Sequence, residues 1–444
     1  MFKGKKIFVL GMARSGYSVA KLLSKDNQVL ITDMSKQDED NVKELISLGC
    51  SVVITDDPLE LLTEDYDYVV KNPGIKREHP VVLKANKLNI PVINELEVSY
   101  HFLNKDVKII GITGSNGKTT TTTIIYEILK NSKYNVHLAG NMGLPLSSMV
   151  SNIKKNDLLV IEISDHQLVD MYDFKTDISV FTNLTETHID FHGTYDVYKN
   201  TKKKIFNNHT KDNVCILNKE SNDLIELTKD IVDDKMYFSS KNIADCYIKD
   251  EAIYYKDELI IELDDIRIKG VHNYENIMSA IIVCKLLDVS NKIIKEELRD
   301  FGGVEHRIEF VKKINKREFY NDSKSTNTVS TITALTSFEN NVVLILGGLD
   351  RGHSFNPLND YVSHVTNIVC YGETANRIKE WGDKLKIDTT IVKDLKEATI
   401  LAYNISEENS TILFSPACAS WDQFKDFEER GDYFKNIVNS IKEN

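Results

Sequence analysis

The fold of this chain is decided by a stretch that reads VKIIGI at 107–112 and continues as TGSNGKTT at 113–120. The first part is an apolar, largely β-branched run, which is typical of a buried strand. After the glycine-bearing second part, Ile124, Ile125, Ile128 and Leu129 recur at helical spacing. A strand, a glycine-bearing loop and an amphipathic helix together form the repeating unit of a parallel α/β sheet.

The same loop predicts a phosphate-binding site. Backbone N–H groups at such a turn cradle phosphates, Lys118 offers a positive charge, and the Thr119 hydroxyl can bind Mg²⁺. The usual G-x-x-x-x-G-K-[ST] spacing would place a glycine at 112, where this chain has Ile112. A glycine turn without a ligand is the alternative. A nucleotide loop alone would also suit a kinase, an ATP-driven switch or a ligase.

Two further copies of the unit flank this one. IFVL at 7–10 precedes GMARSG at 11–16, and a later strand at 29–32 ends in Asp33. This opening resembles a dinucleotide-binding turn, but Ala13 replaces its middle glycine, so a plain strand-to-helix turn fits equally. VVLIL at 342–346 begins the third copy. A polar, alternating stretch at about 240–270 predicts small β-hairpins.

These copies predict an α/β protein of three domains, because 444 residues exceed what a single core accommodates. We place the domains at 1–97, 98–303 and 304–444. The net charge of −12 argues against a nucleic-acid partner, which would require clustered Lys and Arg. The apolar run at 7–10 is too short for a membrane span or a signal-peptide core, and the six cysteines are scattered. We therefore expect a cytoplasmic protein with reduced thiols and no membrane partner.

Three side chains after the phosphate loop form a candidate metal and catalytic cluster. Glu162 ends the apolar strand at 158–161, where a carboxylate beside a phosphate loop can hold Mg²⁺. His188 follows the strand at 178–181, although a lone histidine is more often a structural hydrogen-bonding group. Lys202 shares one face of a predicted helix with Tyr195, Tyr198 and Ile205, so it points to the apolar side unless it snorkels to solvent.

At this point the chain resembles the Mur ligases over essentially its whole length. The resemblance rests on TGSNGKTT at 113–120, TETHID at 185–190, HNYEN at 272–276 and HRIE at 306–309, together with Glu162, Gln167 and the helix that carries Lys202. NDSKSTN at 321–327 and the segment from Ser415 to Phe434 are the most specific matches, and they favour the D-glutamate-adding branch over siblings and folylpolyglutamate-type ligases. The implied fold has an N-terminal Rossmann-like domain for UDP, a central P-loop ATPase-like domain and a C-terminal Rossmann-like domain.

The resemblance also implies the reaction. ATP would phosphorylate the carboxylate of UDP-N-acetylmuramoyl-L-alanine, and the amine of D-glutamate would attack the acyl phosphate, in peptidoglycan precursor synthesis. Thr119 and Glu162 would hold one Mg²⁺, His188 would help hold a second, and Lys202 would be carbamylated. Lys118, Glu162, His188 and Lys202 are thus the implied catalytic residues. A monomer is expected.

The remaining site residues follow from the same resemblance. The implied ATP contacts are Gly114, Ser115, Asn116, Gly117, Lys118, Thr119, Thr120, Asn273, Asn276, Arg307, Asp322 and Lys324. The implied UDP contacts are Ser15, Asp33 and Asn72 to Ile75, including Gly74, with Asn141 and Gln167 near the muramoyl-alanine. The implied D-glutamate contacts are Thr326, Arg351, Ser420 and Phe427, with Ser420 at the start of a predicted helix.

Two positions depart from the resembled pattern. Residues 164–167 read Ser-Asp-His-Gln where relatives commonly have Ser-Ser-Phe-Gln, and Arg351 stands where some relatives carry lysine. Two readings outside the family stay open. An ATP-hydrolysing module would explain the phosphate loop but gives no reason for Glu162, His188 and Lys202 together. A nicotinamide-dependent oxidoreductase is suggested only by residues 11–33.

Overall fold

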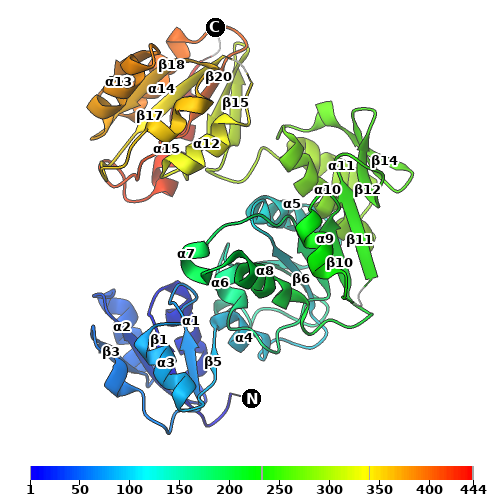
Figure 1. The fold of residues 1–444 in the computed structure, drawn as a ribbon, viewed down its shortest axis with the longest axis vertical. Coiled ribbons are helices and arrows are strands. Elements are labelled where there is room, and N and C mark those ends of the chain that lie inside the picture. Colours follow the sequence, from blue (N-terminus) through cyan, green and yellow to red (C-terminus); the bar gives the residue numbers. More distant parts are fainter. Residues whose placement is uncertain (1, 232–233, 340, 443–444) are drawn as a thin grey trace. The chain divides into compact units, whose positions relative to one another are not determined.

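A computed structural model describes residues 2–231, 234–339 and 341–442. The chain forms two compact units, one of residues 1–263 and 271–298 and the other of residues 264–270 and 299–444. The first unit contains two β-sheets and the second contains one (Figure 1). Among the described residues, none of the helices combines the length and the apolar character that a membrane span requires.

The first sheet has five parallel strands in the order β3-β2-β1-β4-β5. Its strands are β1 (Lys6–Leu10), β2 (Gln28–Asp33), β3 (Ser51–Ile54), β4 (Tyr68–Lys71) and β5 (Val92–Ile93), and its helices are α1 (Arg14–Leu23), α2 (Glu39–Ser47), α3 (Pro80–Lys87) and α4 (Glu95–Tyr100). The strand order reverses between β1 and β4. Ligands of doubly wound sheets bind at such a switch point, beyond the carboxyl ends of the strands.

The second sheet has nine strands in the order β14-β13-β12-β11-β10-β9-β6-β8-β7. Its parallel strands are β6 (Lys108–Thr113), β7 (Val136–Gly140), β8 (Leu158–Glu162), β9 (Ile178–Phe181), β10 (Val214–Asn218), β11 (Asp234–Ser239) and β12 (Cys246–Lys249). The antiparallel strands β13 (Ala252–Tyr255) and β14 (Glu258–Glu262) follow β12, which confirms the predicted hairpins.

Helices surround the central strands of this sheet. They are α5 (Lys118–Lys130), α6 (Asp165–Leu168), α7 (Ile189–His192), α8 (Tyr195–Lys203), α9 (Asn222–Thr228), α10 (Val271–Leu286) and α11 (Asn291–Asp300). Strand β6 lies between β8 and β9, and its apolar side chains are buried. The loops that follow β6, β8 and β9 therefore meet at one edge of the sheet, because parallel strands end on the same side.

The second unit contains a six-stranded sheet in the order β15-β16-β20-β17-β18-β19, in which only β15 is antiparallel to its neighbour. The strands are β15 (Glu309–Ile314), β16 (Arg317–Asn321), β17 (Val342–Gly347), β18 (Val365–Tyr371), β19 (Asp388–Ile391) and β20 (Thr411–Phe414). The helices are α12 (Thr328–Leu335), α13 (Ala375–Lys384), α14 (Leu395–Ile405) and α15 (Phe427–Ser440).

The predicted fold class is confirmed, because the chain is an α/β protein with three mostly parallel sheets. The helix predicted to begin at Ser420 is wrong. Ser420 lies in a turn, and the next helix begins at Phe427 because the Asp426 side chain caps it by accepting a hydrogen bond from the Glu429 N–H. The domain boundaries near residues 97 and 303 stay predictions.

Candidate active site

The predicted phosphate loop connects β6 to the first turn of α5. Gly114 and Gly117 both have positive φ angles, of 145° and 80°. A Cβ atom on Gly114 would lie 2.0 Å from the Thr182 hydroxyl, and one on Gly117 would lie 2.2 Å from Oδ1 of Asn276. Only glycine fits at either position. Ile112, where the usual motif has glycine, is instead a fully buried residue of β6, so this loop is built without that glycine.

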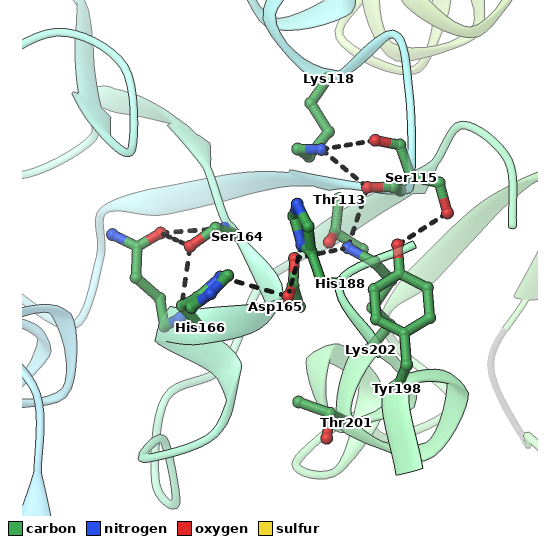
Figure 2. A network of polar contacts seen from close by, with 12 residues as sticks. Thr113, Ser115, Lys118, Ser164, Asp165, His166, His188, Tyr198, Thr201 and Lys202 are labelled. Atoms are coloured by element: carbon green, nitrogen blue, oxygen red, sulfur yellow. Dashed lines mark hydrogen bonds and ion pairs between the residues drawn. The ribbon is translucent and has the colours of Figure 1, made fainter. Parts of the chain in front are cut away.

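Two lysine side chains meet at this loop. Lys118 Nζ donates hydrogen bonds to the carbonyl oxygens of Gly114 and Ser115, both at 2.9 Å. Lys202 Nζ donates to the same Gly114 oxygen at 2.9 Å, although it comes from α8, on the far side of the loop (Figure 2). Two lysine side chains are therefore held next to backbone that is shaped for phosphate.

Lys202 is buried rather than snorkelling to solvent. Its side chain is fully inaccessible and its Nζ lies 5.0 Å from the centre of the Tyr198 ring, whereas Lys203, the next residue, is partly exposed. Burial, reinforced by the nearby charge of Lys118, lowers the pKa of Lys202 to about 7. A substantial fraction of this lysine is thus a neutral amine at physiological pH.

Glu162 ends β8 at the same edge of the sheet. Its Oε1 accepts a hydrogen bond of 2.7 Å from Nδ2 of Asn141, one of the predicted substrate contacts. Its Oε2 is buried and has no hydrogen-bond partner among the described residues. Thr119, the predicted partner of Glu162, is the second residue of α5 and is also nearly buried. An unpartnered buried carboxylate oxygen is a fitting ligand for a hard cation.

His188 approaches from the loop after β9. It has a φ of 54°, which is unusual for a residue other than glycine, and it is the N-cap of α7. Its Nδ1 lies 3.0 Å from Oδ2 of Asp165, and the opposite oxygen of Asp165 lies 3.5 Å from Lys202 Nζ. Asp165 thus connects His188 to Lys202 (Figure 2).

The side chain of Asp165 is the centre of a larger polar network. His192 Nε2 and His166 Nδ1 lie 2.8 Å and 3.2 Å from the same Oδ2 that faces His188. Although burial opposes it, the hydrogen bond from His166 and the charge of Lys202 hold the pKa of Asp165 well below its usual range. For His192, in contrast, burial itself lowers the pKa of the imidazole.

Two cavities in the first unit are lined by residues predicted to contact the substrate. A cavity of about 650 Å³ at the β1/β4 switch point is lined by Asp33, Asn72 and Gly74. A second, of about 560 Å³, includes Asn72 and Gly74 again and is also lined by Ser15, Lys118, Asn141, Gln167 and His188. Residues predicted for the UDP compound and for the phosphate loop therefore share one cavity.

Some predicted contacts in the first unit also have structural roles. Oδ2 of Asp33 accepts a hydrogen bond from the Met12 N–H at 2.7 Å, so it also fixes the β1–α1 turn. Oε1 of Gln167 accepts from the Ser164 N–H at 2.9 Å and completes a capping box on α6. Asn276 on α10 faces the phosphate loop and accepts a hydrogen bond from the Thr121 hydroxyl, while Asn273 lies one turn earlier.

The seven predicted contacts in the second unit follow the ends of its strands or lie nearby, and they are Arg307, Asp322, Lys324, Thr326, Arg351, Ser420 and Phe427. Asp322 is buried, its Oδ2 accepts from the Ser415 hydroxyl at 2.6 Å, and burial raises its pKa to about 6. Lys324 Nζ lies 5.7 Å from the centre of the Phe427 ring, and the Arg351 guanidinium lies 4.7 Å from that of Trp421. Ser420 is buried, whereas Arg307 is exposed.

The chain closely resembles known ligases throughout its length. It is 42% identical over 99% of its own length and 98% of the relative's to UDP-N-acetylmuramoylalanine–D-glutamate ligase from Bacillus cereus (strain G9842). The enzyme of the same name from Geobacillus sp. (strain WCH70) is 40% identical, with 99% of each chain covered. Residues 112–284 match the Mur ligase middle domain, and residues 306–418 match the family model described as Mur ligase, glutamate ligase domain.

The chain belongs to the Mur ligase family. Solved structures agree with this Mur ligase in fold. UDP-N-acetylmuramate-alanine ligase from Thermotoga maritima has a TM-score of 0.60 at 19% identity, with 99% of this chain and 100% of that chain covered. A ligase of the same family, MurF, from Acinetobacter baumannii has a TM-score of 0.59 at 16% identity, with 93% and 91% covered.

His192 and Arg430 were not predicted from the sequence as site residues, and no role was predicted for Asp165. Asp165 and His166 stood out only as departures from the resembled pattern. Arg430 is fully buried on α15 and donates to the carbonyl oxygens of Ser323 and Cys418 at 2.7 Å and 3.0 Å. An arginine in a helix with glutamates around it looks like an exposed residue, so no local signal pointed to its burial.

Proposed function

We propose that this Mur ligase uses ATP to join D-glutamate to UDP-N-acetylmuramoyl-L-alanine through an acyl phosphate. The observation that carries the proposal is the contact of Lys118 and Lys202 with one carbonyl oxygen, that of Gly114, at 2.9 Å each. Phosphoryl transfer is catalysed chiefly by positioning and by neutralising charge on the transferred group. The Lys118 ammonium group, on a phosphate loop at the wall of a cavity, suits that task, and Lys202 lies directly beside it.

We assign the residues of the first unit as follows. The phosphate loop, Gly114 to Thr120, cradles the phosphates of ATP, and Lys118 turns from its loop carbonyls to the outer phosphate. Asn273 and Asn276 contribute from α10. The uridine diphosphate occupies the cavity at Asp33, Asn72 and Gly74, together with Ser15, while Asn141 and Gln167 hold the muramoyl-alanine so that its carboxylate faces Lys118.

Two Mg²⁺ ions complete the proposed site. The unpartnered Oε2 of Glu162, with the hydroxyl of Thr119, would hold the first, and His188 would help hold the second. Mg²⁺ supplies charge neutralisation for the phosphates when it is bound. Lys202, as a neutral amine, would react with CO₂ and release a proton, which gives a carbamate anion suited to the second ion.

The second unit would bind the amino acid and further parts of ATP. Arg351 would offer a positive charge for a carboxylate of D-glutamate, and Thr326, Ser420 and Phe427 would contribute further contacts to the amino acid. Arg307, Asp322 and Lys324 would contact ATP. All six cysteines are free and buried, which supports a cytoplasmic site of action, and we expect the enzyme to act as a monomer.

Phosphate release from ATP tests the proposal against an ATP-hydrolysing module. The purified chain is incubated with MgATP and UDP-N-acetylmuramoyl-L-alanine, and each of a panel of amino acids is added in turn. We expect release only when D-glutamate is present together with the UDP compound. Release without an amine would favour the module, and release with a different amino acid would point to a sibling ligase.

A further inference from the structure

Three imidazole groups surround a single carboxylate oxygen beside the proposed active site. His192 Nε2, His188 Nδ1 and His166 Nδ1 lie 2.8, 3.0 and 3.2 Å from Oδ2 of Asp165. Asp165 and His192 are buried, His166 is partly accessible and His188 is about half exposed. Figure 2 shows His166 and His188 reaching Asp165 from different segments of the chain. Of these four residues, only His188 has a role in the proposed ligase mechanism.

The donor set suits a metal of a different kind from Mg²⁺. Asp165, His166 and His188 each offer one ligand atom, and these atoms lie within 4.8 Å of one another. Zn²⁺ and similar ions bind imidazole nitrogen and carboxylate oxygen at about 2.0–2.2 Å, so an ion between the three groups needs only small side-chain movements. Mg²⁺, in contrast, prefers oxygen ligands, so a set of two imidazoles and one carboxylate suits it less well.

We propose that Asp165, His166 and His188 bind one divalent transition-metal ion of the Zn²⁺ class. The two histidines bind through Nδ1 and carry their proton on the other ring nitrogen. His192 stays outside the coordination sphere and fixes Asp165 through its 2.8 Å hydrogen bond, as outer partners of metal ligands do. The three ligand residues line the 560 Å³ cavity, so the ion is accessible and keeps a position open for water.

This site differs from the proposed Mg²⁺ sites in every ligand except His188. An ion bound to Asp165 and His166 would withdraw His188 from the nucleotide side of the cavity. Zn²⁺ should therefore inhibit the ligase at concentrations below those needed to displace Mg²⁺. The inhibition, unlike metal binding itself, rests on the proposed function.

Cobalt binding tests the site without nucleotide or substrates. Co²⁺ reports its geometry through visible absorption, and we expect one equivalent bound to the full-length chain with an intense tetrahedral band. The double variant Asp165→Asn/His166→Phe should lose this band. His101→Phe is the matched control, because His101 faces Glu97 and Asp173 in another cluster that has only one imidazole, and it should keep the band.

Circular dichroism establishes that each variant is folded, and His166→Phe alone replaces the double variant if the latter is not. The site is overturned if the native chain shows no band, if the double variant keeps it, or if His101→Phe loses it equally. Zn²⁺ titration of ligase activity then follows, and it should inhibit the native chain at least tenfold more strongly than His166→Phe. If Co²⁺ binds specifically but Zn²⁺ inhibits the native chain and His166→Phe equally, the metal site stands and the proposed inhibition of the ligase through this site is wrong.

Discussion

Lys202 is buried with only a distant acidic partner, because the nearest oxygen of Asp165 lies 3.5 Å from its Nζ. Its closest contact is instead the neutral carbonyl of Gly114. A buried ammonium in this setting loses much of its hydration, which is why its pKa falls to about 7. The position can therefore carry out chemistry that requires a neutral amine, and an exposed lysine at the same pH could not.

Replacing Lys202 tests this role directly. We expect Lys202→Ala to lower the ligase rate roughly 100-fold or more, because it removes the carbamate anion proposed to bind the second Mg²⁺, which neutralises charge on the transferred phosphate. Short carboxylic acids should restore part of the rate by supplying the missing anion. Lys203→Ala removes the neighbouring, partly exposed lysine and should change the rate little. A fully active Lys202→Ala enzyme would rule out the carbamate.

Asp322 predicts a specific dependence of stability on pH. Its folded-state pKa of about 6 lies above the value of about 3.9 expected in the unfolded chain. Between these values the folded chain binds more protons, so the Asp322 contribution to the free energy of unfolding falls as pH rises. The Asp322→Asn variant cannot lose a proton at this position, so its free energy of unfolding should not fall for this reason. The free energy of unfolding of the variant should therefore rise relative to that of the native chain between about pH 4 and about pH 6. Urea denaturation at several pH values measures the free energy of unfolding of both chains. A difference between them that does not change with pH would contradict the raised pKa of Asp322.

At the scale of single elements, α15 supports the loops that carry the predicted amino-acid contacts. Its Arg430 has no carboxylate within 4.0 Å among the described residues, and it bonds to backbone oxygens of two loops, 321–327 and 415–420. Nε of Arg430 also donates to the Ser323 hydroxyl at 3.0 Å. The guanidinium fork thus sets the spacing between loops that follow β16 and β20, two neighbouring strands.

Arg430→Lys should disturb both stability and amino-acid binding. Lysine keeps the charge but cannot reach both loops, so we expect a loss of roughly 2–4 kcal/mol in the free energy of unfolding. In the remaining folded enzyme, the KM for D-glutamate should rise more than the KM for the UDP compound. Lys425→Ala, at an exposed position just before α15, is the control. Equal changes in both KM values would mean that Arg430 is only structural.

Features of the site that depend on residues close together in the sequence could be predicted, whereas features that depend on tertiary contacts could not. The inward orientation of Lys202 followed from its spacing to Tyr198, and the position of Glu162 followed from the end of an apolar strand. The Asp165 network could not be predicted in this way, because α6 and α7 contribute its histidines and only the tertiary fold brings them together. The helix predicted at Ser420 is wrong because the helix begins at Phe427 instead, where the Asp426 side chain accepts a hydrogen bond from the Glu429 N–H.

At the scale of the whole molecule, the first unit depends on contacts between its two sheets. Lys71, the last residue of β4, forms a buried ion pair of 2.8 Å with Asp170, which follows α6. The same Nζ donates to the Ile75 carbonyl in the loop that lines both cavities. This pair therefore links the proposed UDP-binding loop to the part of the chain that carries Asp165.

Removing one partner of this pair should be costly. Asp170→Asn leaves the buried Lys71 ammonium without a compensating charge, which typically costs about 3–5 kcal/mol of stability. Asp173→Asn changes a nearby exposed carboxylate and should have little effect. Thermal and urea unfolding measure both variants. Comparable stability of the two would show that the ion pair does not hold the sheets together.

Conversion of the carboxylate of the UDP compound to an acyl phosphate can be measured by isotope transfer. UDP-N-acetylmuramoyl-L-alanine labelled with ¹⁸O in its carboxylate is converted with MgATP and D-glutamate, and the released inorganic phosphate is analysed by mass spectrometry. Attack of the amine on an acyl phosphate leaves one labelled oxygen in the phosphate. We predict one ¹⁸O in each phosphate released, and unlabelled phosphate would rule out the acyl phosphate.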